Sequence, residues 1–296
     1  MESPKTQRER SNALEEKVRD YYDDNTKLFL KLGAGGGTRS IHQPLFMRPE
    51  MSYAEAMHAQ HALILHQLDP RGQPCHVLDL GCGVGASLLY LADNTREPVT
   101  FTGITLSPRQ AVAGHAAVRR AGLERRITIR VGSFLNLPAD LGEVHLAFAI
   151  ESLIHATDLP EVITQLSRRM AHHGRLVIFD DFLRRPAGNQ REKQILHRFR
   201  NGWQGYGLCS VADFIDTAVR HGFSMLDQRD LTGYLRLNRP RDRWIRLIAP
   251  VARLLAPVSR YCTFLVGGNA RQSAYQQGLL QYMQLVLRYD ATTANP

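Results

Sequence analysis

The stretch VLDLGCGVGAS, residues 77–87, decides the fold of this chain. An apolar strand pattern runs directly into a glycine-rich turn, and a helix pattern follows at residues 87–93. Glycines in such a turn let the backbone approach a ligand, and the helix N-terminus offers N–H groups that have no intrahelical partner. A dinucleotide-binding turn has the spacing G-x-G-x-x-G. The spacing here is D-x-G-x-G-x-G, which does not meet that pattern.

Strand and helix patterns alternate after this turn. Further apolar strand patterns lie at residues 100–107, 127–134, 145–150 and 175–182, and helix patterns lie at 107–123 and 159–170. Strands that alternate with helices form a parallel sheet with helices on both faces. The sequence therefore predicts an α/β fold with a doubly wound, mostly parallel sheet.

The segments on either side of this core predict additional elements. Helices are expected at 14–31, before the break GAGGG, and at 52–68, where Ser52 and Glu55 match a capping box. Toward the C-terminus we expect a helix at 211–222, a strand at 223–231, an arginine-rich helical segment at 239–285 and a closing edge strand at 282–290. The expected parts are an N-terminal helical cap (1–70), the core (71–185), and a C-terminal part (186–296) that completes the sheet and carries a helical substrate lid.

Composition narrows the classes of partner. The formal net charge is +9, from 37 Lys and Arg against 28 Asp and Glu, but the basic residues are scattered. A nucleic-acid partner is therefore not expected, since clustered positive charge is its usual footprint. The four cysteines show no metal-binding spacing, which favours a reducing compartment. No signal-peptide pattern and no bilayer-spanning apolar segment is present, so we expect a cytoplasmic protein without stable membrane insertion.

Two core motifs resemble those of a known class of enzymes. The pattern Asp79-x-Gly81-x-Gly83 resembles motif I of the Rossmann-like class I S-adenosylmethionine methyltransferases. The stretch GITLSPRQ (103–110) resembles the cyclopropane fatty acid synthases and the prenyl diphosphate C-methyltransferases. The resemblance implies that S-adenosylmethionine is the cofactor. The cofactor-binding residues that it implies are Asp79, Gly81, Gly83, Thr105, Leu106 and Gln110, with Ser133 and Phe134 as candidates near the adenine.

The N-terminal segments resemble the cap of the geranyl diphosphate C-methyltransferases. The similar stretches are VRDYYDDNTKLFLKLG (18–33), IHQPLF (41–46) and MHAQHALIL (57–65), and the last implies that Gln60 approaches the cofactor. Near the C-terminus, YQQGLLQY (275–282) resembles a family segment of the form Y-x-x-G-x-x-Q-Y. The predicted substrate-binding residues are Tyr22, Arg39, His42, Phe46, Trp203, Tyr206 and Tyr275.

The stretch FAIESLIH (148–155) delivers a carboxylate, Glu151, to the tip of a predicted buried strand. The geranyl diphosphate C-methyltransferase group has a glutamate in the similar context N-E-S. Methylation of an alkene carbon creates a carbocation, and a nearby carboxylate can stabilise that cation and accept its proton. Glu151 is therefore the candidate catalytic base. The alternative is a carboxylate that caps the following helix. His155 and Trp203 are as readily explained as packed residues.

The predicted function is methyl transfer from S-adenosylmethionine to an alkene carbon of an isoprenoid diphosphate. Arg39 and His42 would contact the diphosphate, and Mg²⁺ would accompany it. Asp23 and Asp24 could supply oxygen ligands to that metal, although two exposed acids on a helix are the simpler interpretation. For Asp180 and Asp181, capping or solvation is likewise a simpler interpretation than metal binding. We also expect a homo-oligomer. Three alternatives stay open: an O- or N-methyltransferase of a natural product, an RNA methyltransferase favoured only by net charge, and a non-catalytic cofactor- or lipid-binding protein.

Overall fold

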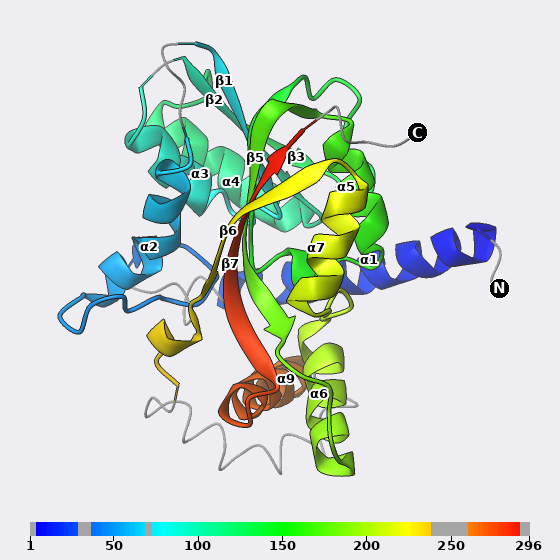
Figure 1. Ribbon diagram of the computed structural model, residues 1–296. Helices are drawn as coiled ribbons and strands as arrows, with labels where there is room; N and C mark the ends of the chain where they lie inside the picture. Colours follow the sequence, from blue (N-terminus) through cyan, green and yellow to red (C-terminus); the bar gives the residue numbers. More distant parts are fainter. Residues whose placement is uncertain (1–3, 29–36, 69–72, 97, 238–259, 291–296) are drawn as a thin grey trace.

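A seven-stranded sheet in the order β3-β2-β1-β4-β5-β7-β6 forms the centre of the protein (Figure 1). The computed structural model describes residues 4–28, 37–68, 73–96, 98–237 and 260–290. The strands are β1 Cys75–Leu80, β2 Val99–Thr105, β3 Ile127–Val131, β4 Val144–Ile150, β5 Met170–Leu183, β6 Phe223–Asp230 and β7 Leu280–Tyr289.

The first five strands confirm the predicted parallel arrangement. β1 pairs in parallel with β2 and β4, β2 with β3, and β4 with β5. The prediction that the last strand closes the edge is wrong. β7 lies between β5 and β6 and is antiparallel to both, so β6 forms the edge. The apolar run of β7 is consistent with this inner position, because an inner strand is covered on both faces.

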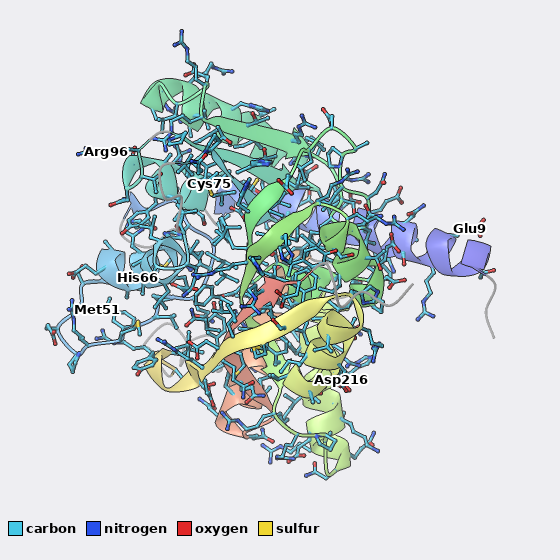
Figure 2. All side chains as sticks on the ribbon, turned by 45° about the horizontal axis from the view of Figure 1, so that its top comes forward. Glu9, Met51, His66, Cys75, Arg96 and Asp216 are labelled. Atoms are coloured by element: carbon cyan, nitrogen blue, oxygen red, sulfur yellow. The ribbon has the colours of Figure 1, made fainter. Side chains whose placement is uncertain are left out.

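Helices cover both faces of the sheet, as Figure 1 shows: α2, α3 and α4 lie on one side, and α5 and α7 on the other. The helices are α1 Pro4–Leu28, α2 Tyr53–Leu65, α3 Ala86–Asp93, α4 Pro108–Ala121, α5 Leu159–Ser167, α6 Gln190–Trp203, α7 Val211–Arg220 and α9 Arg260–Gln276. Each central strand sends alternate residues into two separate cores. In β1, for example, Val77 packs with α3 and α4, whereas Leu78 packs with α5 and α7. Side chains fill the space between these layers (Figure 2).

Several predicted boundaries differ from the structure. α1 begins at Pro4, ten residues before the predicted start at Leu14. α5 ends at Ser167, and β5 begins at Met170, at the end of the predicted helix, because Met170 already pairs with Val144 of β4. The predicted arginine-rich helix is observed only from Arg260 on, and residues 239–259 lie outside the described residues.

Helix α6 was not predicted, although its sequence carries a start signal. Asn189 is the N-cap and accepts a hydrogen bond from the N–H of Glu192, and Ile195 and Phe199 are buried one turn apart. α6 packs against α9 through glycines: a Cβ added at Gly267 would lie 2.5 Å from the carbonyl carbon of Gly202. Close backbone approach at this crossing therefore fixes where α9 lies, and α9 contributes to the site described below.

We expect Gly267→Ala to lower the free energy of unfolding by about 1–3 kcal/mol, because the methyl group overpacks the α6–α9 crossing. The measurement is urea unfolding followed by circular dichroism. Gly268→Ala is the matched control in the same helix, since its Cβ would meet Trp203 at an ordinary 3.6 Å. Both changes raise helix propensity by a similar amount, about 1 kcal/mol. Equal stability of the two variants would contradict the close packing of α6 on α9.

Candidate functional site

A cavity opens at the carboxyl ends of β1 and β4. The strand order reverses here: β2 and β3 lie on one side of β1, whereas β4 and β5 lie on its other side. Ligands of open α/β sheets bind at such a switch point. The cavity contains about 830 Å³ of space, part of it open to solvent. Its walls come from α1, the 37–47 loop, and the turns after β1, β2, β3 and β4.

The glycine turn after β1 shapes the floor of the cavity. Gly81, Gly83 and Gly85 all have positive φ, at 89°, 55° and 78°, a region that residues with a side chain rarely adopt. At Gly83 an added Cβ would meet nothing nearer than the Gln110 amide nitrogen at 4.0 Å. The turn therefore exposes bare backbone to the cavity, next to a buried carboxylate at the end of β1.

That carboxylate, Asp79, is 3% exposed, and its Oδ2 atom has no hydrogen-bond partner in the part of the chain that the structure describes. Burial raises the pKa of Asp79 well above its usual range. A buried carboxylate oxygen without a partner carries a desolvation cost that a cationic ligand group can remove. The same wall holds Thr105, whose hydroxyl donates to the Gln110 side-chain oxygen at 2.8 Å. Both residues line the cavity.

Glu151 stands at the tip of β4 in a left-handed conformation, with φ at 50°. Its carboxylate is 8% exposed and lines the cavity. Oε1 accepts hydrogen bonds from the Gln43 N–H at 2.6 Å and from the Tyr282 hydroxyl at 3.2 Å. Oε2 forms an ion pair with Arg271 at 2.9 Å. These contacts fix the carboxylate in a network of polar side chains and backbone groups. None of them is a contact that caps the following helical turn.

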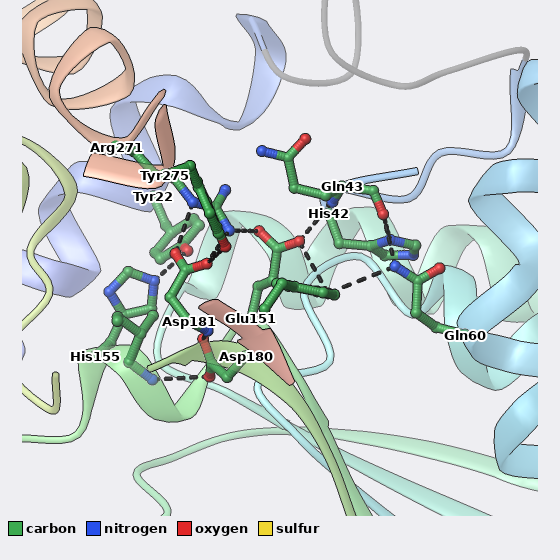
Figure 3. A network of polar contacts seen from close by, with 12 residues as sticks. Tyr22, His42, Gln43, Gln60, Glu151, His155, Asp180, Asp181, Arg271 and Tyr275 are labelled. Carbon is green, nitrogen blue, oxygen red and sulfur yellow. Dashed lines mark hydrogen bonds and ion pairs between the residues drawn. The ribbon is translucent and has the colours of Figure 1, made fainter. Parts of the chain in front are cut away.

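Arg271 joins this carboxylate to a second one, Asp181 on β5 (Figure 3). Its guanidinium donates to Asp181 through Nε at 2.6 Å and through NH2 at 3.0 Å, and the Tyr275 hydroxyl also donates to Asp181. Burial alone would lower the pKa of Arg271, but Asp181 and Glu151 raise it well above its usual range, so it stays charged.

A third carboxylate, Asp180, completes a buried cluster that we call the acidic cluster: Glu151, Asp180 and Asp181 with Arg271. The N–H groups of Asp181 and Ile154 both donate to Asp180, each at 2.9 Å. Burial and the neighbouring Asp181 raise the pKa of Asp180 well above its usual range. Burial also raises the pKa of Asp181, against the effect of Arg271. Asp180 caps the turn at 153–155, in agreement with the capping interpretation. The alternative prediction, that Asp180 and Asp181 are solvated, is wrong because both side chains are buried.

A neutral pair, Tyr22 and His155, lies beside the acidic cluster. The Tyr22 hydroxyl is 2.7 Å from Nε2 of His155, and Nδ1 of His155 is 3.1 Å from the Gln204 carbonyl oxygen. A carbonyl only accepts, so Nδ1 carries the proton, and Nε2 therefore accepts from Tyr22. Burial lowers the pKa of His155 to about 4, which keeps the ring neutral near pH 7. Both residues line the cavity.

The opposite wall is built from the 37–47 loop, and α2 lies behind it. Arg39 lines the cavity and has a positive φ of 60°. His42 also lines it, and its buried Nε2 has no partner among the described residues. Burial lowers the pKa of His42 to about 4. Gln60 lies behind this loop, where its side-chain nitrogen donates to the Gln43 carbonyl at 2.6 Å. Figure 3 shows Glu151 between this wall and the Tyr22–His155 pair.

Helix α1 covers the cofactor side of the cavity with acidic residues. Glu15 accepts from the Ser133 hydroxyl, and Asp23 accepts from the Ser107 hydroxyl. Arg109 forms an ion pair with Asp24 at 4.0 Å. Asp23 and Asp24 thus contact Ser107 and Arg109 at the start of α4 and do not simply face solvent. Over the described ranges, no group of three or more His, Cys, Asp or Glu side chains could hold a metal ion.

The structure brings together most of the predicted site residues, but not all. Those that line the cavity are Tyr22, Arg39, His42, Asp79, Gly81, Gly83, Thr105, Leu106, Gln110, Phe134 and Glu151. Those that lie outside its lining are Gln60, Ser133, Phe46, Trp203, Tyr206 and Tyr275.

The outlying residues have other partners. The guanidinium carbon of Arg236 lies 3.5 Å from the centre of the Phe46 ring, and that of Arg271 lies 5.2 Å from the Trp203 ring. Tyr206 donates to the Gln204 side chain. Trp203 and Tyr275 therefore contact residues of the acidic cluster, Arg271 and Asp181 respectively. Their predicted substrate contacts stay predictions.

Arg271 and Tyr282 are site residues that the sequence analysis missed. Tyr282 was included in a matched segment but given no role. A signal for Arg271 does exist: Arg271 and Tyr275 are four residues apart, and thus on one face of α9. An arginine on the buried face of a helix needs an acidic partner, but the sequence does not say which one.

Comparison with known proteins agrees with this geometry. Residues 77–174, from β1 into β5, match a family model described as "Methyltransferase domain". The chain is 27% identical over 232 residues to 24-methylenesterol C-methyltransferase 2 of Arabidopsis thaliana, covering 77% of this chain and 62% of that protein. It is 31% identical over 152 residues to norajmaline N-methyltransferase of Rauvolfia serpentina, covering 50% of this chain and 51% of that protein. The chain thus spans about half to three fifths of the length of these relatives.

Solved structures show the same fold. A geranyl diphosphate methyltransferase in complex with GPP and sinefungin superposes with a TM-score of 0.71 at 20% identity, covering 93% of this chain and 99% of that one. The chain has the Rossmann-like class I methyltransferase fold. The domain match and the names of the relatives support an S-adenosylmethionine-dependent methyltransferase. Among the described helices, none is long and apolar enough to cross a membrane.

The cavity fits S-adenosylmethionine on its own features. The unpartnered Oδ2 of Asp79 suits the ammonium group of the methionine part, and the bare backbone at Gly83 leaves room for a ligand to approach. The hydroxyl of Thr105 and the amide of Gln110 would offer hydrogen bonds to the ribose of the cofactor. The carboxylate of Glu151 lines the same cavity and suits a nearby positive centre.

We expect S-adenosylmethionine to bind more weakly as the pH is lowered. The raised pKa of Asp79 means that acid converts this carboxylate to its neutral form, which cannot pair with the ammonium. Asp79→Asn should weaken binding about 10- to 150-fold at pH 7, the effect of losing a charge-assisted hydrogen bond of ~1.5–3 kcal/mol, and should flatten the pH dependence. Isothermal titration calorimetry measures both. A variant that keeps the wild-type pH dependence would contradict the assignment of Asp79.

Proposed function

We propose that this protein transfers a methyl group from S-adenosylmethionine to an alkene carbon of an isoprenoid diphosphate. The observation that carries the proposal is the acidic cluster. Three carboxylates lie close together in a buried site, and one guanidinium, that of Arg271, contacts two of them, Glu151 and Asp181. Burial raises the pKa values of Asp180 and Asp181, and the neighbouring carboxylates add to this effect, so this surplus of acidic groups disfavours further negative charge. The same surplus favours a cation, because electrostatic interactions are strong where water is excluded.

The chemistry of alkene methylation makes use of such a site. When bound, S-adenosylmethionine supplies an electrophilic methyl group. An alkene needs no base to begin, since its π-bond is the nucleophile, and the methylated carbon skeleton is a tertiary cation that must lose a proton. Glu151 is the proposed base: three of its roughly four acceptor positions are used, by Gln43, Tyr282 and Arg271, which leaves Oε2 able to accept a proton.

The charges of the cavity also orient a diphosphate substrate. The acidic cluster repels phosphate, so the diphosphate would lie toward Arg39, with the hydrocarbon chain leading to Glu151. Arg39 can donate to phosphate oxygens in bidentate fashion. The neutral His42 donates through Nδ1 to the Gln43 carbonyl, so its unpartnered Nε2 is an acceptor and could bond only a protonated phosphate oxygen. Mg²⁺ would find no group of three or more His, Cys, Asp or Glu side chains to hold it among the described residues. The structures named as geranyl diphosphate methyltransferases support this substrate class by their fold alone.

A second candidate is methylation of nitrogen or oxygen in a natural product. The match to norajmaline N-methyltransferase favours it. In that case Glu151 would orient or deprotonate a heteroatom nucleophile rather than a carbocation. A cytoplasmic location is also proposed, supported by the four free cysteines Cys75, Cys82, Cys209 and Cys262. The expected homo-oligomer stays a prediction.

We expect Glu151→Gln to lower the rate of methyl transfer about 10²- to 10⁴-fold, the usual contribution of a positioned general base. Affinity for S-adenosylmethionine, measured by calorimetry, should change far less. The control is Glu124→Gln, an exposed glutamate in the turn before β3. Mass spectrometry of the reaction mixture gives the rate as a gain of one methylene. Full turnover by the Glu151 variant would remove this residue from the mechanism.

The substrate class is tested with pairs of prenyl diphosphates and prenyl alcohols of equal chain length, with and without Mg²⁺. We expect product from a diphosphate, and Arg39→Gln should lower kcat/KM for it about 10- to 150-fold by removing a charge-assisted hydrogen bond. The same change should leave the alcohol unaffected. Arg48→Gln, on the same loop but exposed and paired with Glu50, is the matched control. If the cofactor binds and no diphosphate or alcohol is methylated, heteroatom methylation becomes the better assignment.

A further inference from the structure

The neutral Tyr22–His155 pair has no role in the mechanism above, although both side chains line the cavity beside the acidic cluster. The pair is fixed at both ends. Nδ1 of His155 donates to the Gln204 carbonyl, so Nε2 must accept from the Tyr22 hydroxyl at 2.7 Å. The Tyr22 hydroxyl proton is thereby engaged in the hydrogen bond to Nε2, and a phenolic oxygen that donates in this way can also act as an acceptor.

We propose that Tyr22 and His155 form a second proton acceptor, which together with Glu151 decides which proton the carbocation loses. This inference rests on the proposed function. The step is balanced: a C–H bond next to the cationic carbon breaks and its electron pair forms the new double bond. The proton passes to the Tyr22 oxygen, and the Tyr22 hydroxyl proton passes to Nε2 of His155. Tyr22 touches the substrate, and His155 acts through it.

The surroundings of His155 tolerate the imidazolium that this step forms. The Gln204 carbonyl accepts from Nδ1 in either protonation state, and Asp181 favours the positive ring. Burial and the charge of Arg271 oppose it and hold the pKa of His155 at about 4, so the ring is ready to accept near pH 7 and returns its proton readily. The ring face of Tyr22 also borders the cavity and can stabilise a cation there, by about 0.5–2 kcal/mol.

Two acceptors at different places on one wall reach different C–H groups of the same cation. Figure 3 shows the pair on one flank of Glu151, beyond Asp181. Glu151 is held by an ion pair and two hydrogen bonds, whereas the pair is neutral and held by hydrogen bonds alone. A cation bound between them can therefore form double-bond isomers, and the chain sets their proportion through the position and basicity of each acceptor.

The test compares the double-bond isomers made from geranyl and farnesyl diphosphate by wild type, Tyr22→Phe and His155→Gln, using gas chromatography and mass spectrometry after dephosphorylation. Phenylalanine keeps the ring but removes the relay oxygen. Glutamine can still accept a hydrogen bond from Tyr22 but cannot hold a proton near pH 7. We expect both variants to lower the same isomer at least ~100-fold relative to the other, the effect of losing a general base.

Two further readouts separate this role from a structural one. Calorimetry should show S-adenosylmethionine binding retained in both variants. Nitrogen NMR of the histidines should show a protonated Nδ1 and a hydrogen-bonded Nε2 in wild type, with the Nε2 hydrogen bond lost in Tyr22→Phe. An unchanged isomer pattern in both variants, or a change in Tyr22→Phe alone, overturns the relay while leaving the proposed function intact. No methylated product from wild type overturns both.

Discussion

The ion pairs of Arg271 hold the site together. One guanidinium from α9 contacts the carboxylates of two neighbouring strands, Glu151 at the tip of β4 and Asp181 on β5. All three side chains are nearly inaccessible to water. Removal of one partner from such a buried pair costs about 3–5 kcal/mol, since an uncompensated charge remains behind. The position of α9, which is fixed by its glycine contact with α6, is thereby coupled to the charge state of the cavity wall.

A second constraint links the N-terminal segments to the same point. Glu151 is a non-glycine residue in the left-handed region, a conformation that costs about 1–3 kcal/mol and persists only where its surroundings hold it. The Gln43 N–H supplies one such contact, and Gln60 in turn holds Gln43 through its carbonyl. The 37–47 loop and α2 therefore help to fix the position of Glu151, although they lie outside the strands of the sheet and the turns that follow them.

The sequence predicted those features that depend on local pattern. The parallel core follows from alternating strand and helix signals, and the place of Glu151 follows because the carboxyl ends of parallel strands meet at one edge. The partners of Glu151 were not predictable in this way. Arg271 lies 90 residues from Asp181 along the chain, and only the folded sheet brings them together. The inner position of β7 was missed for a related reason: strand order in a sheet is a property of the whole topology, while the sequence shows only where each strand begins and ends.

Under the proposed function, the charge balance of the cavity favours alkene methylation over methylation of a heteroatom. A protonated amine or a hydroxyl must lose a proton to become a strong nucleophile, and a carboxylate next to Arg271 is a weakened base for that task. An alkene makes the opposite demand. It is nucleophilic without help, and it needs negative charge only after the new bond has formed, at the carbon that becomes cationic. The carboxylate of Glu151 is held in place beforehand by Arg271, Gln43 and Tyr282, so its field acts at that moment without reorganisation. The Tyr22–His155 pair lies close to Glu151 and is neutral near pH 7, so it can receive a proton without first losing one to solvent.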